Sequence, residues 1–278
     1  MVLPDPPHAG NLEELLRFYA DAGHDEPLNE EPVNRFEEQA SRPAPKPSAT
    51  PPATPASDPR SDQPPPRAPA TAAVPDEQQA MRARALAREA ATIQELHDAL
   101  AGFDGCNLKT TAKNLVFADG NPQARIMLVG EAPGRDEDIQ GLPFVGRSGQ
   151  LLDRMLAAIG LDRTSVYISN VIPWRPPGNR DPSPLETEIC RPFIERHIEL
   201  VDPAVLVTLG NPSTKLLLQT QTGIMRMRGK WAEHTTAAGK QIATMPSLHP
   251  AYLLRNPAHK KLAWRDFLEV KMRLGAAG

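Results

Sequence analysis

A glycine-rich turn with several carboxylates occupies residues 130–138, which read GEAPGRDED. Its glycines, Gly130 and Gly134, allow a bound group to approach the backbone, whose amides could cradle an anion or hydrogen-bond a planar base. Candidates for orienting a water molecule or for pairing with a cation are Glu131 and the acidic run Asp136, Glu137 and Asp138. A phosphate-binding P-loop is the competing interpretation, but the lysine and the Ser or Thr that it needs are absent from this segment.

Two further segments carry side chains suited to a planar base. Phe144 lies in GLPFVG, where it is either an ordinary core residue or a stacking face worth about 1–3 kcal/mol per base. Asn170 is either a turn residue or a reader of a base edge such as that of uracil, because its amide carries both a donor and an acceptor. Cytosine presents the opposite arrangement of hydrogen-bond donor and acceptor at this edge, so it would leave both polar groups of the amide unpaired. Arg175 and Arg180 follow among prolines and could hold backbone phosphates.

A histidine and an apolar segment occur together in MPSLHPAYLLRNP, residues 245–257. His249 is followed by proline, so it is expected on a stiff loop, although a lone histidine is usually structural. Leu253, Leu254 and Arg255 follow it. Apolar residues beside an arginine on an exposed loop tip are typical of a wedge that fills the gap left by an extruded base.

The elements that must position these side chains are short apolar runs alternating with helical stretches. Buried strands are predicted within 124–134, 165–172, 203–210 and 241–250. Helices are predicted at about 75–101, 148–161, 184–201 and after residue 210. This alternation predicts an α/β fold, a three-layer α/β/α sandwich with a central four-stranded parallel sheet. In such sheets ligands bind beyond the carboxyl ends of the strands, where every motif above is found.

Composition divides the chain into three parts. Residues 1–40 form an acidic segment with one short amphipathic helix expected at 11–22, and residues 41–76 contain 12 prolines, which predicts a disordered linker. Residues 77–278 are expected to be the catalytic domain. Residues 1–80 have 6 basic and 14 acidic side chains, whereas residues 81–278 have 25 basic and 20 acidic ones. A basic domain suits a polyanion such as nucleic acid, although many domains have such an excess by chance.

Two cysteines, Cys106 and Cys190, are too few for a disulfide framework or a four-cysteine metal site. No stretch of 18 apolar residues occurs, and the first residues lack the pattern of a signal peptide. The sequence therefore predicts a cytoplasmic protein with no membrane partner, and we expect a monomer.

The four motifs, in this order and spacing, resemble the family 4 uracil-DNA glycosylases over about residues 100–270. The resemblance implies the same layered fold and hydrolysis of the N-glycosidic bond of uracil in single- or double-stranded DNA, which leaves an abasic site. It implies that Glu131, Glu137 and His249 are catalytic. The implied uracil-binding residues are Ala132, Pro133, Phe144 and Asn170. The implied DNA-binding residues are Arg175, Arg180, Leu254 and Arg255.

One departure from this family concerns its iron–sulfur cluster, which four cysteines ligate. In this sequence Cys106 and Cys190 match two of the four positions, whereas Phe103 and Trp174 occupy the other two. A four-iron cluster needs thiolates on its irons. We therefore expect no cluster and no other cofactor or metal, with Phe103 and Trp174 packing in the vacated space.

Two other functions remain open at this level. A module that binds uracil-containing DNA without turnover would keep Phe144 and Asn170, but it would not need both Glu131 and His249. A nucleotide or nucleoside hydrolase would use GEAPG as a phosphate cradle, which the missing P-loop residues disfavour.

Overall fold

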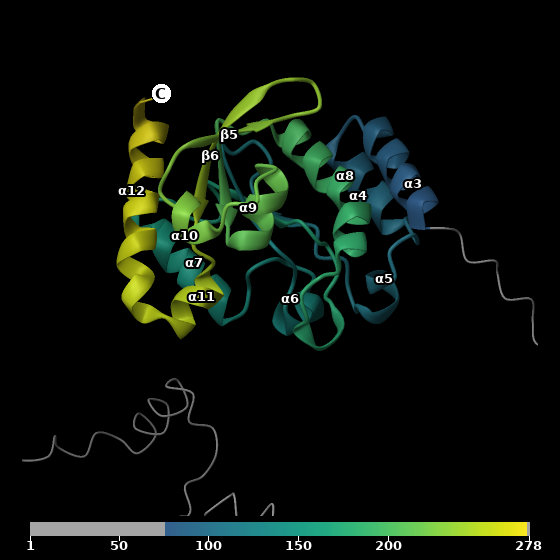
Figure 1. Ribbon diagram of the computed structural model, residues 1–278, viewed down its shortest axis with the longest axis horizontal. Helices are drawn as coiled ribbons and strands as arrows, with labels where there is room; N and C mark the ends of the chain where they lie inside the picture. The colour runs from purple at the N-terminus through teal and green to yellow at the C-terminus, as the bar shows by residue number, and fades with distance from the viewer. Residues whose placement is uncertain (1–75, 277–278) are drawn as a thin grey trace, which may run out of the picture. The chain divides into compact units, whose positions relative to one another are not determined.

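The computed structural model describes residues 76–276, and its centre is a six-stranded sheet with the order β1-β3-β2-β4-β6-β5 (Figure 1). The strands are β1 (Ala118–Gly120), β2 (Ile126–Gly130), β3 (Tyr167–Asn170), β4 (Val205–Leu209), β5 (Ala232–Thr235) and β6 (Gln241–Ser247). β3, β2, β4 and β6 run parallel, which confirms the predicted four-stranded centre. β1 and β5 add short antiparallel edges that we did not predict.

Helices cover both faces of this sheet, as a three-layer sandwich requires (Figure 1). One face is covered by α3 (Asp76–Glu89), α4 (Ile93–Ala101), α5 (Leu108–Thr111), α8 (Pro184–Val201) and α9 (Asn211–Leu217). The other is covered by α7 (Arg147–Ala158) and α12 (Lys260–Ala276). Successive residues of a strand point to opposite faces, so a strand covered on both sides must be apolar throughout, as IMLVG of β2 is.

The remaining helical segments are short. They are α6 (Arg135–Gln140), α10 (Ile224–Met227), α11 (Pro250–Arg255) and the 3-10 turns Pro177–Asn179 and Pro257–His259. α6 begins within the motif at 130–138 and α11 lies within the motif at 245–257, so they fix the direction in which those segments leave the sheet. No helix within residues 76–276 is both long enough and apolar enough to span a membrane.

The single helix predicted at about 75–101 is wrong, because α3 and α4 are separate helices. The Ala90 carbonyl, which would continue the first helix, instead accepts hydrogen bonds from the Arg196 guanidinium of α8 at 2.9 and 3.0 Å. Thr92 then caps α4, since its hydroxyl oxygen accepts a hydrogen bond from Glu95 N at 3.1 Å. A tertiary contact and a cap therefore interrupt a segment rich in helix-forming residues.

The start of α8 is fixed by a capping box and an ion pair. The Ser183 hydroxyl accepts a hydrogen bond from Glu186 N at 3.2 Å, and the Glu186 carboxylate accepts one from Ser183 N at 2.7 Å. Arg180 donates to both oxygens of Glu186, at 2.6 and 2.9 Å. The Arg180 guanidinium holds the pKa of buried Glu186 down to about 2. The loop before α8 is thereby held against the helix.

The N-terminal predictions concern residues that the structure leaves undescribed. The acidic segment 1–40 with its helix at 11–22, and the linker 41–76 up to its last residue, lie outside the described residues. The domain boundary at residue 77 therefore stays a prediction.

Candidate active site

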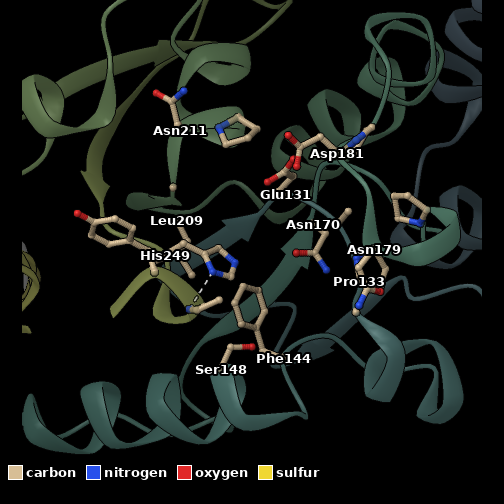
Figure 2. A pocket seen from close by; sticks show the side chains of 18 of the residues that line it. Glu131, Pro133, Phe144, Ser148, Asn170, Asn179, Asp181, Leu209, Asn211 and His249 are labelled. Carbon is tan, nitrogen blue, oxygen red and sulfur yellow. Dashed lines mark hydrogen bonds between the residues drawn. The ribbon is translucent and has the colours of Figure 1, made fainter. Parts of the chain in front are cut away.

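The carboxyl ends of the four parallel strands open into a cleft of about 510 Å³ (Figure 2). Segments that follow β2, β3, β4 and β6 all contribute to its wall. After β2 the chain adds β3 on one side and then β4 on the other, so the strand order reverses between β2 and β4. Ligands in open α/β sheets bind at such a reversal. The volume lies within the range of about 300–1,000 Å³ that is usual for small-ligand sites.

The cleft brings together the residues expected to act on the base. It is lined by Glu131, Ala132, Pro133, Glu137, Phe144, Asn170 and His249. Of the four residues expected to contact DNA, Arg180 and Arg255 also line it. Arg175 and Leu254 are not part of the lining. Segments up to about 120 residues apart in the sequence thus form one site.

The loops expected to meet DNA differ from the expectation in two respects. Arg175 is held within the protein, since its Nε donates to Asn179 Oδ1 at 2.7 Å and its guanidinium lies 3.9 Å from Asp138. Residues 250–255 form helix α11 and not a loop tip. Leu253 is only 1% exposed, within a cluster that includes Leu151, so the expectation that it belongs to a wedge is wrong.

Gly130, at the end of β2, allows two recognition side chains to meet. A Cβ at this position would lie 2.4 Å from Asn170 Oδ1 and 2.6 Å from Phe144 Cζ, closer than real contacts allow. The ring of Phe144 also lies beside the imidazole of His249, with 5.4 Å between centroids and 31° between planes (Figure 2). An aromatic face, an amide and an imidazole therefore share one corner of the cleft.

Asn170 is buried at the end of β3, and its Oδ1 has no hydrogen-bond partner among the described residues. A buried polar atom without a partner costs about 1–3 kcal/mol. Figure 2 shows the side chain directed into the cleft, beside Phe144. A ligand with an N–H group at this point would satisfy the amide oxygen.

His249 is the N-cap of α11, and this role sets its tautomer. Its Nδ1 accepts a hydrogen bond from Ala251 N at 3.1 Å, so the proton of the neutral ring is on Nε2. Burial, with a smaller contribution from Arg255, lowers the pKa of His249 to about 4. The ring is therefore neutral at pH 7, and Nε2 is a hydrogen-bond donor.

Glu131 differs from the other cleft carboxylates in its electrostatics. Burial raises the pKa of Glu131, and the nearby Asp181 carboxylate raises it further. Figure 2 shows these two carboxyl groups side by side. No hydrogen bond from another residue of the described chain lowers the pKa of Glu131. A carboxylate in this condition is suited to accepting a proton from water.

Glu137 has its oxygens engaged by the backbone. It accepts hydrogen bonds from Gly134 N at 3.1 Å, from Val145 N at 3.0 Å and from Gly146 N at 3.0 Å. These contacts join the GEAPG turn to the PFVG segment. The geometry supports a role in holding the two segments together.

Some residues of the cleft were missed by the sequence analysis. They include Ser148, Asp181, Asn211 and Tyr252. Asn211 follows Gly210 at the end of the third predicted strand, so the strand-end rule could have found it. Tyr252 was hidden by the interpretation of its segment as a loop. Its hydroxyl is within 2.7 Å of His259 Nδ1, which holds its ring at the cleft wall.

The region that corresponds to the family's cluster contains two thiols and two aromatic rings. Cys106 and Cys190 are buried and reduced, with 3.9 Å between their sulfur atoms. Phe103 and Trp174 are also buried in the core cluster that contains these cysteines. Within residues 76–276 no group of three or more His, Cys, Asp or Glu side chains could hold a metal ion. The donor set does not fit a four-iron cluster.

The fold and the cleft together define a class. A doubly covered parallel sheet places an aromatic face, an amide, a neutral imidazole and a carboxylate around one cleft. This arrangement is that of an enzyme which holds a heterocyclic base and cleaves a bond to it with water.

Comparison with known proteins identifies the family. Residues 117–268 match the model of the uracil DNA glycosylase superfamily. The chain is 43% identical over 169 residues to the type-4 uracil-DNA glycosylase of Archaeoglobus fulgidus, covering 59% of this chain and 84% of that protein. For the type-4 uracil-DNA glycosylase of Saccharolobus solfataricus the identity is 42% over 176 residues, covering 62% and 81%. The chain belongs to the uracil-DNA glycosylase superfamily, and its resemblance to family 4 is confirmed.

Proposed function

We propose that this protein removes uracil from DNA by hydrolysing the N-glycosidic bond, releasing free uracil and leaving an abasic site. The observation that carries the proposal is the buried, unpartnered Oδ1 of Asn170 beside the ring of Phe144. Uracil N3–H would donate to this oxygen, and uracil O4 would accept from the amide nitrogen. Phe144 would stack on the face of the base. Ala132 and Pro133 would pack against it.

His249 would stabilise the leaving group. Cleavage leaves negative charge on the uracil ring, and a donor aimed at O2 lowers the energy of the transition state. The Nε2–H of a neutral imidazole is such a donor, and the contact with Ala251 N keeps the proton on Nε2. The lowered pKa supports this form at neutral pH.

Glu131 would position the attacking water and offset the positive charge that develops on the sugar. Its raised pKa brings a carboxylate toward the range in which it can take a proton from water. Glu137 would contribute by fixing the turn that carries Glu131, because its oxygens already accept three backbone hydrogen bonds. A direct contact of Glu137 with water or base stays a prediction.

DNA is the partner of the cleft, and its strandedness is a further proposal. Arg255 lies on the cleft wall, where it would meet a phosphate beside an extruded nucleotide. Arg180 lies on the same wall and would approach a phosphate while keeping its ion pair with Glu186. Leu254, which is half-buried, would support the opened strand, and Arg175 would contact DNA only if it leaves Asp138. We propose that the enzyme accepts single- and double-stranded DNA, acts as a monomer and is located in the cytoplasm.

An excision assay separates this function from the two others that the sequence leaves open. Oligonucleotides with one uracil, single- or double-stranded, are incubated with the enzyme and treated with alkali, which cleaves the strand at abasic sites. We expect cleavage at uracil only. A binding module would retain uracil DNA without cleavage. A nucleoside hydrolase would release base from free nucleosides, and that result, without action on DNA, would contradict the proposal.

We further propose that the enzyme works without an iron–sulfur cluster. Cys106 and Cys190 are the only cysteines of the chain, and Phe103 and Trp174 replace the other ligands. Protein purified without oxygen is expected to be colourless and to contain no stoichiometric iron or sulfide. A monomer that carries four irons and their sulfides, together with a visible absorption band, would overturn this expectation.

A further inference from the structure

The stacking residue Phe144 has an uncommon backbone. Its φ is +54°, in the left-handed region that residues with a Cβ rarely adopt, and its side chain is buried. Such a conformation persists only where the surroundings enforce it. The direction of the ring depends on this conformation, because φ sets where the Cβ points.

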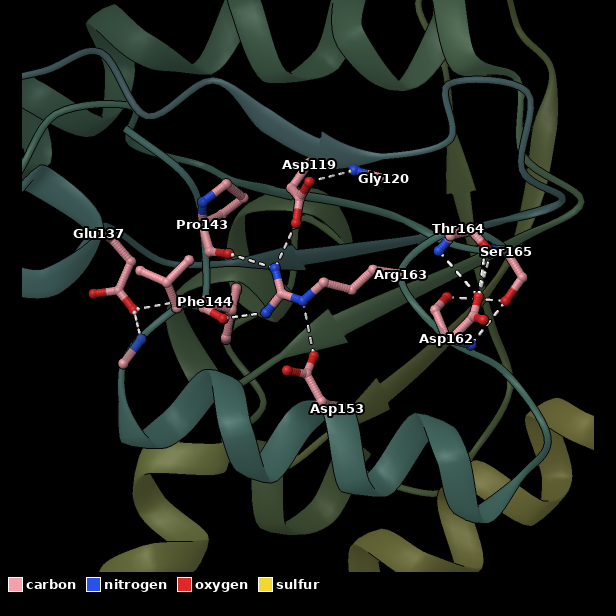
Figure 3. A network of polar contacts seen from close by, with 12 residues as sticks. Asp119, Gly120, Glu137, Pro143, Phe144, Asp153, Asp162, Arg163, Thr164 and Ser165 are labelled. Atoms are coloured by element: carbon pink, nitrogen blue, oxygen red, sulfur yellow. Dashed lines mark hydrogen bonds and ion pairs between the residues drawn. The ribbon is translucent and has the colours of Figure 1, made fainter. Parts of the chain in front are cut away.

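Arg163 binds the carbonyl side of this strained segment (Figure 3). Its Nη1 donates to the Pro143 carbonyl at 3.2 Å, and its Nη2 donates to the Phe144 carbonyl. Two carboxylates orient the guanidinium: Asp119 of β1 accepts from Nη1 at 2.5 Å, and Asp153 of α7 accepts from Nε at 2.9 Å. The sheet edge, helix α7 and the PFVG segment are thus joined through one side chain.

Glu137 binds the other side of the segment, because its carboxylate accepts hydrogen bonds from the backbone amides of Val145 and Gly146. Gly149 completes the enclosure, since a Cβ there would lie only 1.7 Å from the Phe144 carbonyl oxygen. Carbonyls on one side and amides on the other are therefore held by two side chains of opposite charge. Arg163 itself does not line the cleft.

We propose that Arg163 is a positioning residue for uracil recognition: it holds Phe144 in its left-handed conformation, so that the ring is in stacking position before the base enters. This inference rests on the proposed function, because it assigns a role to the stacking ring of that site. Prearranged contacts strengthen binding, since no ordering is required when the ligand arrives. Lysine, with a compact charge and no planar fork, cannot bind two carbonyls and two carboxylates together.

The test is a double-mutant cycle between Arg163→Gln and Phe144→Ala. Single-turnover excision is measured against enzyme concentration, which gives the half-saturating concentration for uracil DNA and the rate at saturation. Arg163→Gln is expected to raise the half-saturating concentration by about tenfold, a part of the stacking contribution, and to change the saturated rate less than threefold. In the Phe144→Ala background the same substitution should have little further effect. Arg163→Lys should be intermediate.

Two controls separate positioning from general loosening or from loss of a phosphate contact. Arg196→Gln removes a guanidinium that likewise binds a backbone carbonyl, that of Ala90, and a carboxylate, that of Glu199, but touches nothing at Phe144. Its affinity should stay at the wild-type value even if its melting temperature falls. Binding of undamaged DNA of equal length should be unchanged by Arg163→Gln.

Additive effects of Arg163→Gln and Phe144→Ala, or equal weakening for undamaged DNA, would overturn the inference. If Arg163→Gln does not fold, the cycle is run with Arg163→Lys and Asp153→Asn, for which coupling to Phe144 is again expected and additivity again contradicts it. The proposed function is judged separately. A wild-type enzyme that excises uracil while the cycle is additive leaves the function intact and removes the role of Arg163.

Discussion

His249→Ala is expected to slow single-turnover cleavage of uracil DNA by about a hundredfold or more, equivalent to about 2.7 kcal/mol of transition-state stabilisation. The charge that His249 would stabilise exists mainly in the transition state, so the affinity for uracil DNA should change only a few-fold. The measurement is the cleavage rate at saturating enzyme, together with the enzyme concentration that gives half of it.

The pH profile of the wild-type enzyme tests the protonation state of the His249 ring. Because the pKa of His249 is lowered to about 4, wild-type activity should not decline through this residue between pH 8 and pH 5. The acid limb of the profile should instead follow Glu131, whose pKa is raised, and Glu131→Gln should remove that limb. His97→Ala, at a half-buried position on α4 beside Phe117, is the matched histidine control. A His249→Ala enzyme with near wild-type rate would transfer the leaving-group role to other donors of the cleft.

Asn170→Asp is expected to weaken uracil excision at least tenfold. An ionised carboxylate has no donor for uracil O4, and the charge would be buried at the end of β3. A protonated acid would donate where the amide oxygen accepts, which matches cytosine better than uracil. The assay compares uracil and cytosine oligonucleotides at several pH values.

Asn121→Asp is the matched control for this substitution, because Asn121 stabilises a turn after β1 by accepting from Gln123 N at 2.9 Å. Gly120 of β1 pairs with Tyr167, the first residue of β3, whereas the cleft lies at Asn170, the last residue of β3. The turn at Asn121 is therefore at the opposite end of the strands from the cleft. Unchanged uracil activity in Asn170→Asp would remove Asn170 from the site.

The strand ends could be predicted from the sequence, whereas the directions of the loops could not. Asn170 and His249 each follow an apolar run, and a parallel sheet brings the ends of such runs to one edge. The partners of Arg175 could not be predicted, because Asp138 comes from a different motif and meets it only in the folded protein. The burial of Leu253 depends on Leu151 of α7, which is distant in the sequence.

Intrinsic helix and strand propensities gave the wrong prediction where tertiary contacts determine the secondary structure. The alanines between α3 and α4 favour a continuous helix, but the contact of Arg196 with the Ala90 carbonyl ends it. The edge strands β1 and β5 were missed because ADG and AEHT lack the apolar pattern of a strand. They form through pairing with β3 and β6. These differences lie away from the strand ends, which is why the candidate site was recognised despite them.

The ion pair between Arg180 and Glu186 has a consequence for how DNA affinity responds to electrolyte. A cation that neutralises a phosphate releases a condensed counterion, which adds about 0.9 to the slope of log affinity against log salt on duplex DNA. The charge of Arg180 is already balanced, because Glu186 stays ionised at any pH well above about 2. Arg180→Gln should therefore reduce that slope by much less than the amount that one phosphate contact contributes. Glu186→Gln, which frees the charge of Arg180, should increase the slope.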